Sequence, residues 1–125
     1  MIKILYVGLG GFIGCILRYL VNLLAPKLFG AQFPYATLIV NTLGAFLIGL
    51  IMTLGENRIS PEARVFLVTG ILGGFTTFSA FSYETVSLLS AGNYGAGLLN
   101  VGLNVAFSLG GAVLGISAAR LLLRS

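Results

Sequence analysis

Apolar residues fall into four long stretches along this chain, and short polar or turn-forming segments separate them. A helix needs roughly 20 mostly apolar residues to cross the bilayer core, which is about 30 Å thick. The stretches predict four membrane-crossing helices, at about 4–24, 34–54, 63–89 and 95–122. The connecting segments are too short to hold a soluble domain. We therefore expect residues 1–125 to form a single all-α transmembrane domain.

The composition excludes a water-soluble fold of this length. Of the residues, 58% are hydrophobic and 8% are charged, and the mean hydropathy is +1.06. A small globule cannot hide so much apolar surface from water. The basic residues are scattered near the ends of the stretches, which is typical of headgroup anchors and not of a nucleic-acid surface. They favour a cytoplasmic N-terminus, because most would then lie inside: Lys3, Arg58, Arg64, Arg120 and Arg124.

Residues that could support enzyme chemistry are almost absent. The chain has no histidine, three acidic residues and one cysteine, Cys15, which we expect to be a small buried residue. Zinc clusters, intrachain disulfides and acid–base hydrolysis therefore lack their side chains. A glycine-rich segment at residues 8–14 is close to a dinucleotide fingerprint, but Ile13 occupies the third glycine position. We expect no enzymatic activity.

Two pairs of glycines have the spacing that lets membrane helices approach closely. Gly10 and Gly14 lie four residues apart in the first stretch, and Gly111 and Gly115 lie four apart in the last. In lipid, such G-x-x-x-G pairs bring helix backbones into contact. The 18 glycines of the chain therefore predict tight helix packing.

Polar side chains inside the predicted spans mark either interhelical hydrogen bonds or a pathway, because a polar group in hydrocarbon is costly unless it is satisfied. Thr37 and Asn41 are four residues apart and share one helix face. Asn41 alone favours an interhelical hydrogen bond. Asn100, Asn104 and Ser108 follow at steps of four and form a stripe along the last span, and a stripe of donors favours a pathway.

The third stretch contains residues that are poorly suited to an unbroken helix. Gly73 and Gly74 lower helix stability, and the stiff pair Thr76–Thr77 follows them near the middle of the span. We expect a break there; the alternative is an intact helix with a glycine packing notch. A broken helix is tolerated at membrane depth where its freed carbonyls line a cavity or bind an ion.

Arg18 is the one basic residue well inside a predicted span. It lies close enough to the end of 4–24 for its head group to reach the interface, so it is expected to anchor the helix there. The alternative is that it attracts anions to a vestibule. No basic residue is expected at the middle of the membrane.

Three segments resemble the Fluc (CrcB) fluoride channels, and together they extend over nearly the whole chain. They are residues 10–19, residues 37–49 and residues 70–81. The last holds the pattern G-G-x-T-T-F-S-x-F, from Gly73 to Phe81, which is close to a family signature. The stripe in the last span departs from the family, which has tyrosine and serine where this chain has Asn100 and Asn104.

The resemblance implies an antiparallel, dual-topology homodimer with two fluoride pores and one structural sodium ion at the centre of the dimer interface. By position, Asn41 is the pore asparagine, and Phe78 and Phe81 turn ring edges toward the anion. Backbone carbonyls of Gly73 and Thr76 from both subunits would hold the sodium. Three further residues would line the polar track: Thr37, Asn104 and Ser108.

The function implied by the resemblance is passive fluoride efflux across a bacterial inner membrane, which lowers cytoplasmic fluoride. One alternative is a small dual-topology multidrug exporter, a class that also has four helices in about this length. Those exporters depend on a membrane-buried glutamate in the first helix, and residues 4–24 contain none. Another alternative is a non-conducting subunit of a membrane assembly, in which the polar residues would only hold helices together.

Overall fold

The computed structural model describes residues 1–125, which are helical apart from short connections. The spans are α1 (Ile2–Phe29), α2 (Tyr35–Leu54), a composite third span over Pro61–Ser90, and α6 (Tyr94–Arg124). All four are long and apolar enough to cross a membrane. The prediction of an all-α chain with four spans is confirmed.

The helices run further than the hydropathy pattern suggested, most of all at the end of α1. The segment after residue 24 was expected to be a connection, but α1 continues through Pro26 and ends at Phe29. A proline removes only one backbone donor, and the other backbone groups have no water to bind in lipid, so an unbroken helix keeps them paired. Gly30 then ends the helix with a φ of 91° while its N–H donates to the carbonyl of Pro26.

The third span consists of four pieces. α3 (Pro61–Arg64) begins at Ser60, whose hydroxyl accepts a bond from the N–H of Ala63. A π-helix, η1 (Val65–Leu72), follows and leads into the single turn α4 (Gly73–Phe75). Two residues are then extended before α5 (Phe78–Ser90) begins.

The extended pair is Thr76, with ψ 163°, and Thr77, with φ −155° and ψ 121°. The predicted break is therefore confirmed, at the two threonines that follow the glycines. The π-helix before it was not predicted. Its wider turns have no hydropathy signature, because its residues are apolar like those of any membrane helix.

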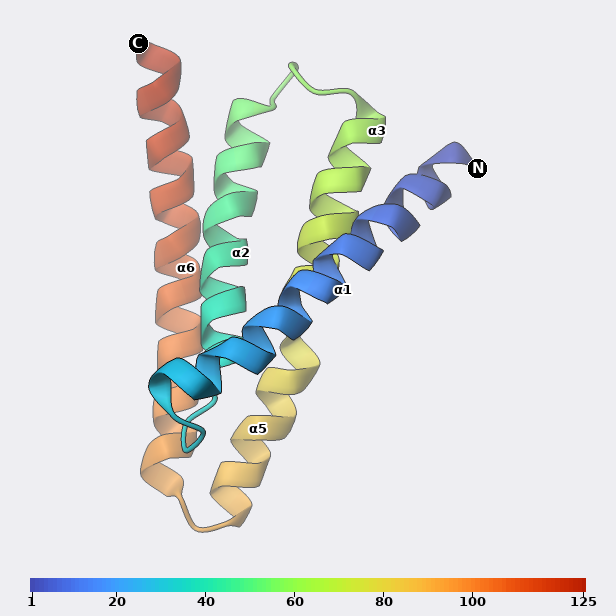
Figure 1. Ribbon diagram of the computed structural model, residues 1–125. Helices are drawn as coiled ribbons and strands as arrows, with labels where there is room; N and C mark the ends of the chain where they lie inside the picture. The colour runs from blue at the N-terminus through green and yellow to red at the C-terminus, as the bar shows by residue number, and fades with distance from the viewer.

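α1 crosses the third span obliquely, whereas α2 and α6 stand side by side (Figure 1). The crossing is close because Gly10 and Gly14 face η1. A Cβ on Gly10 would collide with the Phe66 carbonyl, and one on Gly14 with the Ile71 carbonyl. The first predicted glycine pair thus lets α1 lie directly on the backbone of the third span.

The second glycine pair does the same between α6 and α2. A Cβ on Gly111 would lie 2.9 Å from the carbonyl oxygen of Thr42, and one on Gly115 would collide with the Phe46 carbonyl. From the other side, a Cβ on Gly49 would lie 2.6 Å from the carbonyl of Ala112. Reciprocal glycines therefore hold these two helices at backbone contact.

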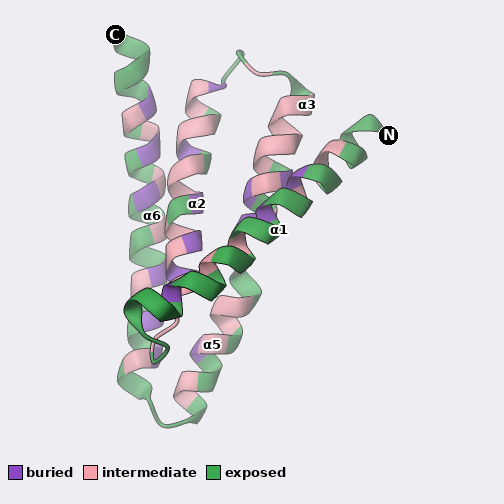
Figure 2. Ribbon diagram, viewed as in Figure 1, coloured by how far each residue is buried: buried purple, intermediate pink, exposed green.

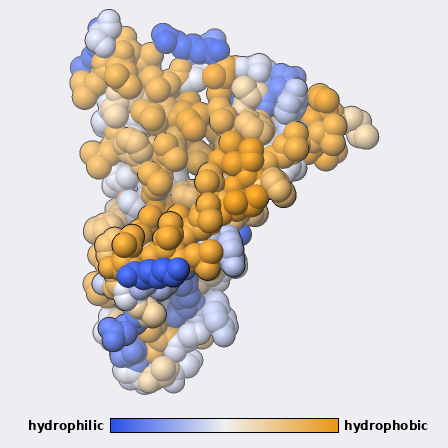
Figure 3. Space-filling view, viewed as in Figure 1, coloured by the Kyte–Doolittle hydropathy of each residue, from blue (hydrophilic) through white to orange (hydrophobic).

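Most of the surface is apolar, as expected for a chain that lies in lipid or against another chain. Only 19 of the 125 residues are buried, and they gather where helices pack against one another (Figure 2). Hydrophobic side chains cover the middle of the visible face, while hydrophilic ones concentrate near its two ends (Figure 3). Such an arrangement matches a bilayer with water on both sides.

Candidate functional site

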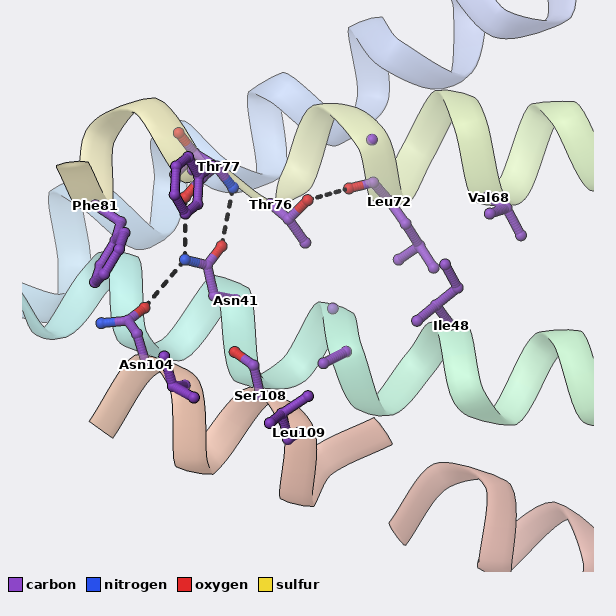
Figure 4. Close-up of a pocket in the computed structure, with 15 residues that line it drawn as sticks. Asn41, Ile48, Val68, Leu72, Thr76, Thr77, Phe81, Asn104, Ser108 and Leu109 are labelled. Atoms are coloured by element: carbon purple, nitrogen blue, oxygen red, sulfur yellow. Dashed lines mark hydrogen bonds between the residues drawn. The ribbon is translucent and has the colours of Figure 1, made fainter. Parts of the chain in front are cut away.

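A cavity of about 520 Å³ lies beside the break, between α2, the third span and α6 (Figure 4). Most residues predicted from the sequence to form a site line it: Asn41, Gly73, Thr76, Phe78, Phe81, Asn104 and Ser108. Its remaining lining is mainly apolar, with Leu72 and Leu109 among the side chains. The structure therefore brings amides, hydroxyls and phenyl rings together without a charged side chain.

Asn41 bridges the break in the third span. Its Nδ2 donates to the carbonyl of Thr77 at 3.0 Å, and its Oδ1 accepts from the N–H of Thr77 at 2.9 Å. These are backbone groups that lose their helical partners because Thr77 is extended. Asn41 thus forms hydrogen bonds between helices and also lines the cavity.

A chain of side-chain hydrogen bonds runs from Asn41 away from the cavity. The Nδ2 of Asn41 donates to Oδ1 of Asn104 at 3.1 Å, and the Nδ2 of Asn104 donates to Oδ1 of Asn100 at 2.9 Å. The Nδ2 of Asn100 donates to the Thr85 hydroxyl at 2.9 Å, which donates to the Phe81 carbonyl at 2.8 Å. We call Asn41, Asn104, Asn100 and Thr85 the amide relay.

The three polar residues of the stripe on α6 do not all face the cavity. Asn100 is completely buried and does not line the cavity, whereas Asn104 and Ser108 do. Thr85 was not predicted as part of any site, although it lies on the helix that also carries Phe81. Nothing in its local sequence distinguishes it, because its importance comes from its contact with Asn100 across two helices.

Thr37 does not line this cavity, although it shares a face of α2 with Asn41. Its hydroxyl donates to Oε1 of Glu84 at 2.6 Å, and only 3% of Thr37 is exposed. The candidate site residues derived from the sequence did not include Glu84. The sequence does single it out in one respect, because Glu84 is the only acidic residue well inside a span.

Arg18 lies near the middle of α1, with 16 helical residues before it and 11 after it. Arg18 lies further from the end of the helix than the sequence suggested, because α1 continues to Phe29. Its Nε donates to the carbonyl of Gly74 at 2.9 Å. A guanidinium thus caps the carbonyl end of α4, immediately before the break.

Cys15, one turn before Arg18, is exposed and not buried as expected. Its Sγ is 4.0 Å from an Arg18 nitrogen.

The two predicted phenylalanines follow the break on the first turn of α5. The ring centroids of Phe78 and Phe81 are 5.5 Å apart and the rings are tilted by 48°. Phe78 is 78% exposed, whereas Phe75, on the other side of the break, is only 6% exposed and packs in the core. Phe78 therefore projects from the chain into space that no part of this chain fills.

Gly73 is the first residue of α4, and Thr76 directly follows its last residue. A Cβ on Gly73 would meet only the Val68 carbonyl, at 3.7 Å, so the glycine leaves open space on the cavity side. The Thr76 hydroxyl donates to the carbonyl of Leu72 at 3.1 Å. No group of three or more His, Cys, Asp or Glu residues could hold a metal ion. This region therefore offers a cation neutral oxygen atoms, from the backbone and from hydroxyl and amide side chains.

Comparison with known proteins gives a consistent match over almost the whole chain. Residues 5–116 match the family described as CrcB-like protein, Camphor Resistance (CrcB). A Clostridium perfringens protein named Fluoride-specific ion channel FluC is 53% identical over 120 residues, which cover 94% of each chain.

Relatives from other bacteria carry the same name. A Thermus thermophilus protein is 50% identical over 125 residues, covering 92% of this chain and 100% of its own. A Ruminiclostridium cellulolyticum protein is 48% identical over 122 residues, covering 96% of this chain and 94% of its own.

Proposed function

This chain belongs to the CrcB-like family, and from that premise we propose that it forms a fluoride-selective ion channel. It is a multi-pass membrane protein with four helices that can span the bilayer. The observation that carries the proposal is the cavity at the break, where uncharged donors and ring edges meet. Fluoride leaves the cell through it down its electrochemical gradient, without a nucleotide or a proton gradient.

The cavity has the chemistry that a strongly hydrated anion needs. Amide N–H and hydroxyl groups replace water around the ion, and Asn41, Asn104 and Ser108 carry such groups. Phe78 and Phe81 add the positive edges of their rings. Several weak sites in series let an ion leave as well as enter, whereas a lysine or arginine in the path would retain it. Arg18 is not among the cavity-lining residues.

Thr37 takes its place beside the next part of this path. Thr37 lies four residues along α2 from Asn41, and its hydroxyl donates to Glu84 of α5. We assign Thr37 to the polar track because it shares this face of α2 with Asn41, one helical turn beyond the cavity; the acidic Glu84 is not itself part of the path. Arg18 acts differently: it holds the carbonyl end of α4 in place and adds positive potential near the break.

The working channel is an antiparallel homodimer in this proposal. Two features of the single chain support it: Phe78 is largely exposed beside the cavity, and Gly73 faces open space. A second copy in the opposite orientation would close both openings and form a second, equivalent pore.

The central sodium ion fits the oxygen ligands that the break offers. Hard cations take about six oxygen ligands. The carbonyls of Gly73 and Thr76 would supply two from each chain and four from a dimer, so one chain alone is too few and other oxygen atoms would complete the shell. A sodium bound there would add a fixed positive field near both pores without touching the anion. The backbone leaves helical geometry at Thr76, and the two carbonyls would thereby become free to bind the ion.

Fluoride efflux from proteoliposomes tests the function. Vesicles loaded with fluoride, without a proton gradient, should release it when the protein is present, while vesicles loaded with chloride should not. Uptake of a cationic drug that depends on a proton gradient would instead identify an exporter. Failure to move either solute would leave a non-conducting assembly subunit. Equal rates for chloride and fluoride would contradict the proposed selectivity.

A further inference from the structure

We propose that the amide relay is reversible, and that its reversal turns N–H groups of Asn41 and Asn104 together toward an anion in the cavity. This inference rests on the proposed function and concerns how its pore obtains donors. Asn100 and Thr85, which do not line the cavity, become positioning residues for fluoride binding.

In the observed direction, the donors of the relay are already engaged. One N–H of Asn41 bonds the Thr77 carbonyl and the other bonds Asn104. The Asn104 amide nitrogen donates to both the backbone and the side-chain oxygen of Asn100. Figure 4 shows the consequence, since the Asn104 nitrogen points away from Asn41 and its oxygen points toward it. An anion arriving in this arrangement would face an oxygen at Asn104.

Rotating the Asn104 amide by half a turn exchanges its nitrogen and oxygen. The nitrogen would then face Asn41, so two amide N–H groups would point at one place in the cavity. The Asn104 oxygen would face Asn100, which must rotate as well and donate to it. A side-chain amide has a donor at one end and an acceptor at the other, so both rotations preserve the bonds between side chains. The bond from the Asn104 nitrogen to the Asn100 backbone carbonyl is lost, which adds to the cost of the reversed direction.

Thr85 completes the reversal because a hydroxyl both donates and accepts. After Asn100 rotates, its Oδ1 faces Thr85, whose O–H can turn from the Phe81 carbonyl to that oxygen. Phe81 stays satisfied, since its carbonyl lies in α5 and is in position to accept the helical N–H four residues on. A leucine at Asn100 or a valine at Thr85 would interrupt this exchange.

The reversed relay is stable only with an anion present. Without one, the facing N–H groups of Asn41 and Asn104 would be buried donors with no acceptor, which costs about 1–3 kcal/mol per group. The empty pore therefore rests in the observed direction, with its donors satisfied. Fluoride supplies the missing acceptor, and the donors become available only where and when it binds. Burial favours this coupling, because Thr85, Asn100 and Asn104 are each at most 7% exposed.

Side-chain amide NMR tests the relay in the full-length protein. The chain has six asparagines, and selective ¹⁵N labelling in lipid nanodiscs would resolve them by single substitutions. Addition of sodium fluoride should shift the Asn41, Asn104 and Asn100 signals together, and equal sodium chloride should not. Asn57 and Asn93, in the connections, serve as internal controls. Shifts at Asn41 and Asn104 with an unmoved Asn100 would overturn the proposal.

Flux variants give a second, independent measure. Thr85→Val keeps the shape of the side chain but removes the hydroxyl that bonds Asn100 in both directions of the relay. It should change the rate of fluoride efflux, by up to about tenfold where the two directions lose unequally from one missing hydrogen bond. Thr85→Ser should restore it. Leu98→Ala, on the exposed face of α6, is the matched control with unchanged flux. Equal flux in the valine and serine variants would contradict the relay.

The two proposals fail in different ways. A wild-type protein that releases no fluoride refutes the channel. The relay alone is refuted if the wild-type protein conducts fluoride normally, the Asn100 amide signal does not shift, and the Thr85 variants have unchanged flux.

Discussion

Replacing each of the two adjacent glycines before the break separates contacts inside the chain from contacts with a second copy. Gly73→Ala places a methyl group in open space, 3.7 Å from its nearest neighbour, the Val68 carbonyl. Gly74→Ala places one 2.8 Å from the carbonyl oxygen of Gly11. The same methyl would lie 3.1 Å from the backbone nitrogen of Cys15. Both of these neighbours are backbone atoms of α1 and cannot rotate away.

The expected magnitudes follow from these distances. Alanine is favoured over glycine inside a helix by roughly 0.5–1 kcal/mol, and this gain is common to both variants. Only Gly74→Ala adds overpacking, which costs about 1–3 kcal/mol. A single chain should therefore unfold more easily with Gly74→Ala than with Gly73→Ala. Gly73→Ala should instead weaken the dimer, because its methyl group enters the space assigned to the partner and the sodium ion.

Three measurements distinguish these effects. The free energy of unfolding is followed in mixed micelles at several protein-to-detergent ratios, the dimer fraction by cross-linking, and fluoride efflux in vesicles. Gly74→Ala should lower stability at every dilution. Gly73→Ala should lose dimer and flux, with a stability change that depends on dilution. Gly73→Val should lose more, and Gly8→Ala, whose methyl meets nothing within 4 Å, should lose nothing.

One outcome would refute the assignment of Gly73 to the dimer interface. If Gly73→Ala lowered the free energy of unfolding as much as Gly74→Ala at every dilution, its space would belong to the chain itself. A Gly73→Val protein with normal dimer fraction and normal flux would also remove Gly73 from the proposed sodium site.

Three further substitutions test single contacts. Asn41→Asp should abolish fluoride efflux by placing a like charge in the path, and undiminished efflux would exclude Asn41 from the pore. Arg18→Leu should lower the free energy of unfolding by about 1–3 kcal/mol, because the Gly74 carbonyl loses its partner, with Arg18→Lys intermediate in a denaturant titration. Gly14→Ala should lower the thermal midpoint, because its methyl collides with the Ile71 carbonyl; an unchanged midpoint would contradict that packing.

The spans, the glycine contacts and the break were predictable because each has a local cause. Hydropathy over about 20 residues identifies a span, spacing of four identifies a glycine pair, and Gly73–Thr77 carries its own helix-breaking residues. The end of α1 was predicted too early because Pro26 usually ends a helix in water. In lipid, the unpaired backbone groups that follow a helix end are more costly than one missing donor, and the helix continues.

The site was predictable only in part, because its connections are made between helices. Asn41, Asn104 and Ser108 could be selected as polar residues in apolar spans, and the cavity brings them together. Thr37 was selected on the same ground but bonds Glu84, outside the cavity. Thr85 and the direction of each amide depend on which helix face meets which. No spacing within one helix contains that information.

In the proposed channel, the break would offer positive potential to an anion without a fixed cation in the cavity. Interrupting a helix creates a carbonyl end and an N–H end, and each carries a partial charge. The carbonyl end of α4 would repel an anion, and Arg18 neutralises it through Gly74. The N–H end of α5 lies beside the cavity, where Asn41 holds the Thr77 backbone and the Thr77 hydroxyl accepts from Ala80.

A lysine in place of this helix end would give a stronger field but would bind the ion too tightly to release it. Half a unit of charge spread over several N–H groups is weaker and fixed in direction, so it lowers the barrier to entry without trapping the ion. In the proposed channel, the arginine and the asparagine would therefore have complementary tasks at the break. Arg18 would neutralise the carbonyl end of α4, and Asn41 would hold the N–H end of α5 beside the cavity.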